Sequence, residues 1–165
     1  MSAYGFDPSQ KDATAMFVPG TIKEEPATGS TASTFENSGP RRWRYVKAGG
    51  ALTLGAPATI TTSAVNYLSV TNVAAATIAT RVAGIAQQAF DSGEYGWVLC
   101  FGLGTVKVAT GAGTSNAGDM MVTDAGNIGV DSAAADEGAE AAEIIGHFAA
   151  SIAAEATGLA FIRCE

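Results

Sequence analysis

The sequence predicts a mainly β protein, a compact antiparallel barrel or sandwich of short strands with an extended N-terminal arm and at most one short helix. Short apolar segments recur between Gly, Asn, Asp or Pro residues, which supply the dihedrals of turns. With 165 residues, the chain can bury a sizeable core within one domain. Its 47% hydrophobic content excludes a disordered chain, and its 15% of charged residues is low for a free monomer. We therefore expect much of the surface to contact other protein.

The densest structural signal lies in residues 81–108, which predict a β-hairpin. Two apolar runs, VAGIA and WVLCF, flank the turn sequence DSGEYG. Both faces of the strand from Trp97 to Cys100 carry apolar side chains, so we expect a central strand. Gly102 and Gly104 interrupt the alternation, as at a bulge or a barrel corner.

The other strands are short and are separated by turn residues. The predicted strands are 45–47, 59–62, 67–70, 81–86, 97–101, 105–109, 120–123, 127–130, 144–149 and 159–163. The helix candidate is 132–143, where Ala and Glu favour a helix and Gly138 weakens it. Many short strands with few helical segments indicate a barrel or sandwich.

We predict an arm over residues 1–44 and a β-barrel or sandwich domain over 45–165. Four of the five prolines lie in the first 40 residues, which have no period of 2 or 3.6. The aromatic residues of the arm are scattered, which is typical of a segment lying extended across another surface. These residues are Tyr4, Phe6, Phe17 and Phe35. A plain disordered tail is the alternative.

A weak internal repeat divides the β domain. At an offset of 62 residues, Gly84 and Gly96 align with Gly146 and Gly158. The repeat suggests two similar halves, about 45–104 and 105–165, although ordinary barrel pairing would explain it without duplication.

The junction between arm and domain carries three arginines interleaved with two aromatic residues. These are Arg41, Arg42, Trp43, Arg44 and Tyr45. The pattern fits a nucleic-acid stacking patch, a protein interface, or a first strand with alternating exposed arginines. Of the two binding alternatives we favour the protein interface, because residues 51–165 hold eleven acidic and three basic side chains and would repel phosphates.

Several partners and compartments are disfavoured. The acidic balance argues against nucleic acid as principal partner, and no apolar run approaches the roughly 20 residues that span a bilayer. The N-terminus lacks the order of a signal peptide, so we expect folding in a cytoplasm. Cys100 and Cys164 have no CxxC spacing and are expected to be reduced core residues.

The sequence does not indicate an enzyme, a metal site or a cofactor. His147 is the sole histidine, which excludes a two-histidine metal site, and no nucleophile elbow or phosphate-binding glycine loop occurs. The carboxylates within 136–143 match no calcium loop and predict a solvated acidic face. Asp91 and Glu94 are the closest acid–base pair, and nothing near them in the sequence would separate their pKa values.

Three segments together resemble a known class of proteins. They are YVKAGGALTLGAPATITTSAVNY, VAGIAQQAFDSGEYGWVLCFGLGTVKV and IIGHFAASIAAEATGLAFIRC. Their order and composition, over about residues 45–165, look like the small β-rich head decoration (cement) proteins of tailed bacteriophages. The resemblance implies a structural protein that binds the exterior of a phage capsid, commonly as a homotrimer, and stabilises the shell in the virion after assembly in the host cytoplasm.

The implied partners are the major capsid protein and further copies of this chain, with no nucleic acid and no membrane. We expect the contacts to come from the arm and the junction. The residues concerned are Tyr4, Phe6, Phe17, Phe35, Arg41, Arg42, Trp43, Arg44 and Tyr45. The alternatives are a phage fibre or receptor-binding module and, further away, a small carbohydrate-binding or hydrolytic β domain.

Overall fold

The computed structural model confirms a mainly β fold. It describes residues 5–26, 39–60, 69–71, 82–110, 113–124, 127–131 and 144–164. Within these residues all regular structure is β, and eleven strands form one mixed sheet. The helix candidate 132–143 lies outside the described residues.

The strands lie close to the predicted positions. In chain order they are β1 (Lys11–Asp12), β2 (Ile22–Glu25), β3 (Arg41–Ala48), β4 (Pro57–Ile60), β5 (Ser69–Thr71), β6 (Val82–Ala86), β7 (Tyr95–Lys107), β8 (Met120–Asp124), β9 (Asn127–Asp131), β10 (Gly146–Phe148) and β11 (Thr157–Arg163). Two predicted segments, 97–101 and 105–109, belong largely to the single long strand β7. The strand that was expected to begin at residue 45 begins at Arg41, and the arm adds β1 and β2 to the sheet.

The sheet is not one closed barrel, and its pairings form two rings instead. In the first, which we call unit 1, β3 pairs with β5, β5 with β4, β4 with β6, β6 with β7, and β7 with β3. Nine buried side chains form its core: Val46, Ala48, Leu52, Ala58, Val70, Ala83, Ala86, Phe90 and Val98. The strands of unit 1 thus enclose a core of their own.

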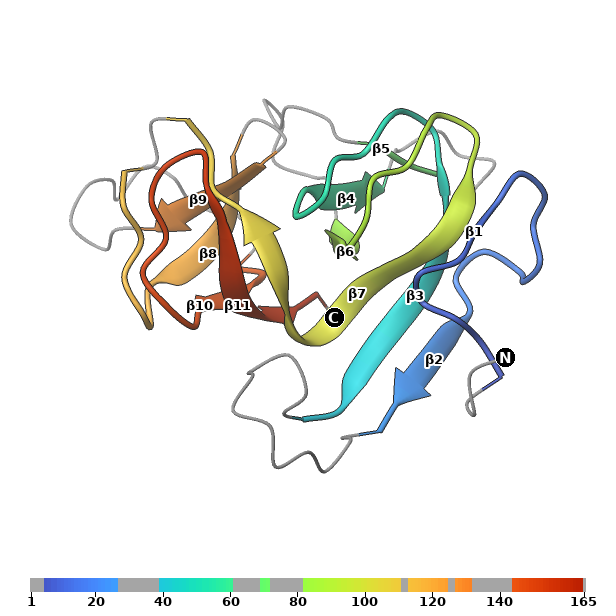
Figure 1. Ribbon diagram of the computed structural model, residues 1–165, viewed down its shortest axis with the longest axis horizontal. Helices are drawn as coiled ribbons and strands as arrows, with labels where there is room; N and C mark the ends of the chain where they lie inside the picture. The colour runs from blue at the N-terminus through green and yellow to red at the C-terminus, as the bar shows by residue number, and fades with distance from the viewer. Residues whose placement is uncertain are drawn as a thin grey trace.

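The second ring, unit 2, begins with the last part of β7. This part pairs with β11, β11 pairs with β10, β10 with β8, and β8 with β9. A parallel bridge between Val108 and Ile128 returns β9 to the end of β7. Figure 1 shows the two units side by side, with β7 curving from one into the other. The strand is therefore common to both units.

The two units share one hydrogen-bonding pattern. The pair Ile85–Leu99 in unit 1 corresponds to His147–Phe161 in unit 2, at the offset of 62 residues. The bridge between Leu52 and Phe90 corresponds to the bridge between Ser115 and Ile152. Matching the strand pairings of the two units, at offsets of 58 to 63 residues, carries the nine core positions of unit 1 onto nine residues that are all buried: Val106, Val108, Ser115, Met121, Ile128, Ile145, Phe148, Ile152 and Ala160. The repeat is therefore a repeat of backbone architecture.

The glycines aligned by the sequence repeat mark positions where a side chain has no room. A Cβ on Gly84 would lie 2.7 Å from the Leu99 carbonyl oxygen, and one on Gly146 would overlap the Phe161 carbonyl oxygen. Gly96 and Gly158 likewise lie under Phe90 and Ile152. Gly84 and Gly146 each allow two strands to approach closely, and Gly96 and Gly158 each leave room for a side chain. Glycine therefore occurs at both positions of each aligned pair.

A second apolar cluster joins the two units and continues under the arm. It includes Ile85 and Leu99 from unit 1 and Ile162 from unit 2, all fully buried. Cys100 and Cys164 are buried members of this cluster and are not joined in a disulfide. The largest apolar residues of the chain therefore pack between the units as well as inside them.

Candidate functional site

The described part of the arm lies on unit 1. β2 extends the sheet by pairing with β3, with Ile22 opposite Arg44. β1 pairs with the start of β7, where Lys11 lies opposite Gly96 and its Nζ is 3.1 Å from Glu94 Oε2. In Figure 1 the arm follows one side of the molecule, far from β8 and β9. The arm is thus extended, as predicted, and the surface that it covers belongs to its own chain.

Two phenylalanines of the arm anchor it in an aromatic cluster. The ring centroids of Phe6 and Phe17 lie 4.8 and 5.1 Å from that of Trp97. Tyr45 completes the cluster at 5.0 Å from Trp97 and 5.3 Å from Phe17. Tilted and edge-on rings at these distances attract one another in addition to burying apolar area. Phe6, Trp97 and Tyr45 are buried, so the cluster is part of the core.

The arginines of the junction lie on β3 beside the glutamates of β2. Arg41 Nη1 is 3.9 Å from Glu25 Oε2, and Arg42 Nε is 3.2 Å from Glu24 Oε1. The buried Trp43 donates its indole N–H to Glu25 at 3.0 Å. Arg44 is half-buried and has no ion pair within the described residues. β2 therefore neutralises part of the positive charge of the junction.

The structure gives the nine predicted interface residues different surroundings. Phe6, Trp43 and Tyr45 are buried in the chain, and Phe17 is partly buried against the same cluster. The three arginines remain at the surface. Tyr4 and Phe35 lie outside the described residues. The alternation of arginine and aromatic residues in the junction is that of a strand, with Trp43 and Tyr45 turned into the core.

The hydroxyl of Tyr45 ties the arm to β3. It donates to Asp12 Oδ2 at 3.1 Å and accepts from the Met16 N–H at 3.1 Å. Burial raises the pKa of Tyr45 above its ordinary value, and the bond to Asp12 and the charge of that carboxylate raise it further, while the Met16 N–H opposes the shift. The neutral hydroxyl is therefore the form that stabilises the folded arm.

Replacing Tyr45 by phenylalanine tests the contribution of these two hydrogen bonds. The variant Tyr45→Phe keeps the ring and loses two hydrogen bonds, so we expect its free energy of unfolding at neutral pH to fall by about 1–2 kcal/mol. Because the folded pKa is raised, this contribution is complete below pH about 10 and is lost as the pH rises through the folded pKa. Denaturant titrations from pH 7 to 11 should show a shallower alkaline loss in the variant. Tyr95→Phe is the control at neutral pH, and an unchanged stability and alkaline slope in Tyr45→Phe would contradict the prediction.

Two exposed apolar surfaces stand out among the residues that the structure describes. The first, the arm face, contains Met16 and Val18, which are 65% and 77% exposed. The second, the unit 2 hollow, has a volume of about 460 Å³ and lies over β8, β10 and β11. The residues that line the hollow are Met120, Ile144, Gly146, His147, Phe161 and Arg163. Figure 1 shows the arm toward one end of the long axis, and β8, β10 and β11, over which the hollow lies, toward the other.

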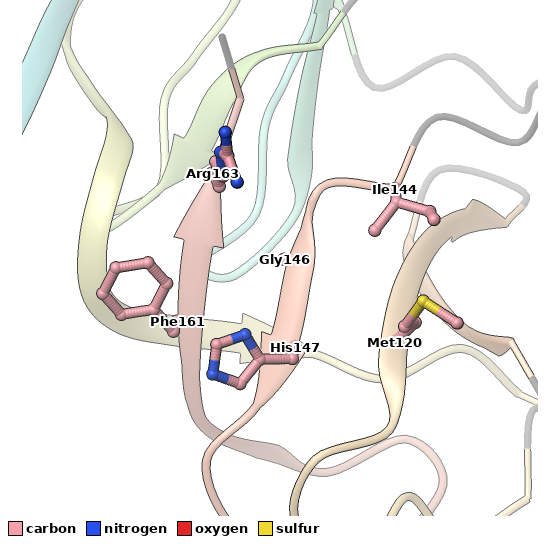
Figure 2. A pocket seen from close by; sticks show the side chains of 6 residues that line it. All are labelled: Met120, Ile144, Gly146, His147, Phe161 and Arg163. Atoms are coloured by element: carbon pink, nitrogen blue, oxygen red, sulfur yellow. The ribbon is translucent and has the colours of Figure 1, made fainter.

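The hollow combines apolar and cationic groups. Figure 2 shows His147 on β10 beside Phe161 on β11, and Met120 across from them on β8. The rings of His147 and Phe161 stack with centroids 5.4 Å apart and an angle of 20° between their planes. Arg163 has no ion pair within the described part of the chain. The site can bind an apolar side chain and an adjacent acidic group.

The hollow was not predicted from the sequence, although the sequence contains a signal for it. Two apolar doublets, Met120–Met121 and Ile144–Ile145, lie in or beside strands, where neighbouring side chains point to opposite faces. Met121 and Ile145 are fully buried, whereas Met120 and Ile144 are 38% and 53% exposed. An apolar residue on the outer face of a strand whose inner face is already filled indicates a contact surface.

Neither a metal site nor a membrane-spanning helix occurs among the described residues. Among them no three His, Cys, Asp or Glu side chains are placed to hold a metal ion. No helix there is long and apolar enough to cross a membrane. The carboxylates of 136–143 lie outside the described residues.

Within the described residues, the fold is all-strand and consists of two repeated units with exposed apolar faces. No protein-family model matches the chain, and a search of curated proteins finds no match. Among solved structures, the chain is similar to the base of the head fibre protein gp8.5 of bacteriophage phi29, with 13% sequence identity and a TM-score of 0.49. That similarity covers 74% of this chain and 94% of the phage chain.

Proposed function

We propose that this chain is a structural protein of a phage virion, which binds the outer surface of the capsid as a homo-oligomer, a homotrimer by expectation, and stabilises the shell. The observation that carries the proposal is the pair of exposed apolar surfaces on a chain whose two units already have filled cores. Such surfaces are typical of proteins that bind other proteins. The capsid as partner follows from the resemblance of residues 45–165 to phage decoration proteins.

The three arginines of β3 are our candidate for the capsid contact. Arg41, Arg42 and Arg44 line the side of the molecule where β2 forms the edge of the sheet. Arginine is enriched at the energetic centres of interfaces, since its guanidinium binds carboxylates with two hydrogen bonds. Arg44 lacks an ion pair among the described residues and is the arginine with most to gain from an acidic partner.

Binding of the full chain to capsids that lack it tests the proposal. We expect the protein to sediment with these capsids and to raise the temperature at which they disassemble. The variant Arg44→Glu should weaken binding at least about tenfold, because a lost charge pair is replaced by repulsion. Lys107→Glu is the control, since it makes the same charge change on unit 2.

The result also separates the proposal from a fibre or receptor-binding module. A chain of that kind would bind host cells, and it would leave the thermal stability of the capsid unchanged. Sedimentation with cells but not with capsids would therefore overturn the proposed function. Arg44→Glu binding as tightly as the parent chain would move the capsid contact away from β3.

A further inference from the structure

In unit 1, one face of β6 and of the first part of β7 points away from the unit's own core, and this outer face is buried. It carries Val82, Ile85 and Leu99, which are nearly or fully buried against unit 2. Gln87, just beyond β6, donates from Nε2 to the Thr105 carbonyl oxygen at 3.0 Å and accepts from the Thr105 N–H at 2.9 Å. The element that covers this face is therefore the last part of β7, which Gln87 contacts at the backbone edge of Thr105.

The contact between the units is close enough to involve backbone. A Cβ on Gly55 would lie 2.6 Å from the Lys107 nitrogen, and the Lys107 N–H donates to the Gly55 carbonyl oxygen at 3.0 Å. A Cβ on Gly104 would meet Leu99 and the end of Ile162. Unit 1 thus carries a face that is shaped to receive a copy of the same fold.

The corresponding face of unit 2 is the hollow. Ile144, His147 and Phe161 occupy the positions that Val82, Ile85 and Leu99 occupy in unit 1. No described segment covers them as unit 2 covers unit 1. Gly118, the counterpart of Gly55, has no atom within 4 Å of the position of a Cβ. The same kind of face is buried in unit 1 and exposed in unit 2.

We propose that the unit 2 hollow binds a second copy of this chain, and that the arm face of that copy fills it. In unit 1 the covering element is the backbone edge of β7 at Thr105, whose counterpart in the repeat is the edge of β3 at Tyr45. The arm lies along that edge, where the Gly20 N–H donates to the Tyr45 carbonyl oxygen and the Tyr45 N–H donates to the Thr21 carbonyl oxygen, so a second copy would present the arm there. The arm offers Met16 and Val18, which are the most exposed large apolar residues described.

Charge and symmetry are consistent with this partner. Arg163 at the hollow lacks an ion pair among the described residues, and a chain of net charge −7 supplies acidic groups. The contact joins two different surfaces, so it is heterologous and leads to closed rings when the rotation closes. This inference rests on the proposed homo-oligomer and names the surfaces that form it.

Two single variants of the full chain and their mixture test the contact. Ile144→Lys alters the hollow and Val18→Glu alters the arm face, and both side chains are exposed, so folding should be unaffected. Light scattering after gel filtration should show an oligomer for the parent chain and a monomer for each variant, with self-association weakened at least about tenfold. Leu54→Glu, which changes another exposed apolar residue, should leave the oligomer intact.

The mixture distinguishes this arrangement from others. The Val18→Glu copy keeps an intact hollow and the Ile144→Lys copy keeps an intact arm face, so equal amounts should form a heterodimer. A parent chain that stays monomeric overturns the inference, as does an oligomer that survives both substitutions. If Val18→Glu remains oligomeric while Ile144→Lys does not, the hollow pairs with another surface and the proposed arrangement is wrong. Capsid binding by the parent chain is measured separately, so the proposed function can stand when this inference fails.

Discussion

Alanine in place of Gly146 is expected to lower the free energy of unfolding by on the order of 3–5 kcal/mol. The residue has a φ of +144°, and a Cβ there would overlap the Phe161 carbonyl oxygen and approach the Met121 Cε to 2.6 Å. The Phe161 oxygen belongs to the β10–β11 pairing, so relief of the overlap requires separation of two strands of unit 2. Denaturant titration followed by circular dichroism measures the loss.

A matched variant isolates the steric effect from the backbone effect. Gly118→Ala also places a side chain at a positive φ, +92°, but no atom lies within 4 Å of its Cβ position. Its cost should be about 1 kcal/mol, the ordinary penalty for a left-handed alanine. Equal losses in the two variants would show that the close approach of β10 and β11 at Gly146 does not limit stability.

Truncation of Trp97 to alanine should lower the free energy of unfolding by a similar amount, about 3–5 kcal/mol. Trp97 is buried and contacts Phe6, Phe17 and Tyr45, so the cavity would open between unit 1 and the arm. We expect the arm to detach before the units unfold, which limited proteolysis and amide hydrogen exchange of residues 5–26 would detect. Phe101→Ala, at a half-buried ring on the same strand, should leave the protection of the arm unchanged.

A double-mutant cycle measures how strongly the side chains of Trp97 and Phe6 interact. Their interaction energy should be about 0.5–1.5 kcal/mol, the range for aromatic pairs. An interaction energy near zero, with the arm of Trp97→Ala still protected from exchange, would show that the backbone pairing of β1 and β2 alone holds the arm.

The hairpin that contains Trp97 was predicted from local sequence patterns, whereas the position of the arm was not. The hairpin within 81–108 was predicted from its alternation, because strand periodicity and turn residues are local properties. Its second strand is central as expected, since β7 pairs with β1, β3, β6 and β11. The arm was harder, because scattered aromatic residues bury themselves equally well on their own chain or on a partner. Only the three-dimensional placement of Trp97 and Tyr45 decides between the two.

The repeat shows a second limit of sequence reasoning. The units share pairings and core positions, but the side chains that fill equivalent positions differ: Leu52 corresponds to Ser115, and Phe90 to Ile152. Ser115 is buried, and its hydroxyl donates to the Ile152 carbonyl oxygen and accepts from the Ile152 N–H. A core tolerates such changes when other residues take up the volume. The glycines remain alike because a close backbone approach has no such compensation.

The hollow was missed for a related reason. A strand pattern tells which residues share a face, but not whether another unit covers that face. Ile85 and His147 occupy equivalent positions, and one is buried while the other is exposed. The difference arises from what packs against each unit, which no local property of the chain records.

The strand common to both units has a consequence for how this architecture can change over time. β7 supplies the last strand of unit 1 and the first strand of unit 2 without a linker between them. Deleting either unit would leave an unpaired edge on β7, so neither can be lost, exchanged or shuffled as a module. An insertion within β7 would shift the register of every strand that pairs with it. Lineages of this protein should therefore vary in their surface loops and arm, while the length of β7 stays constant.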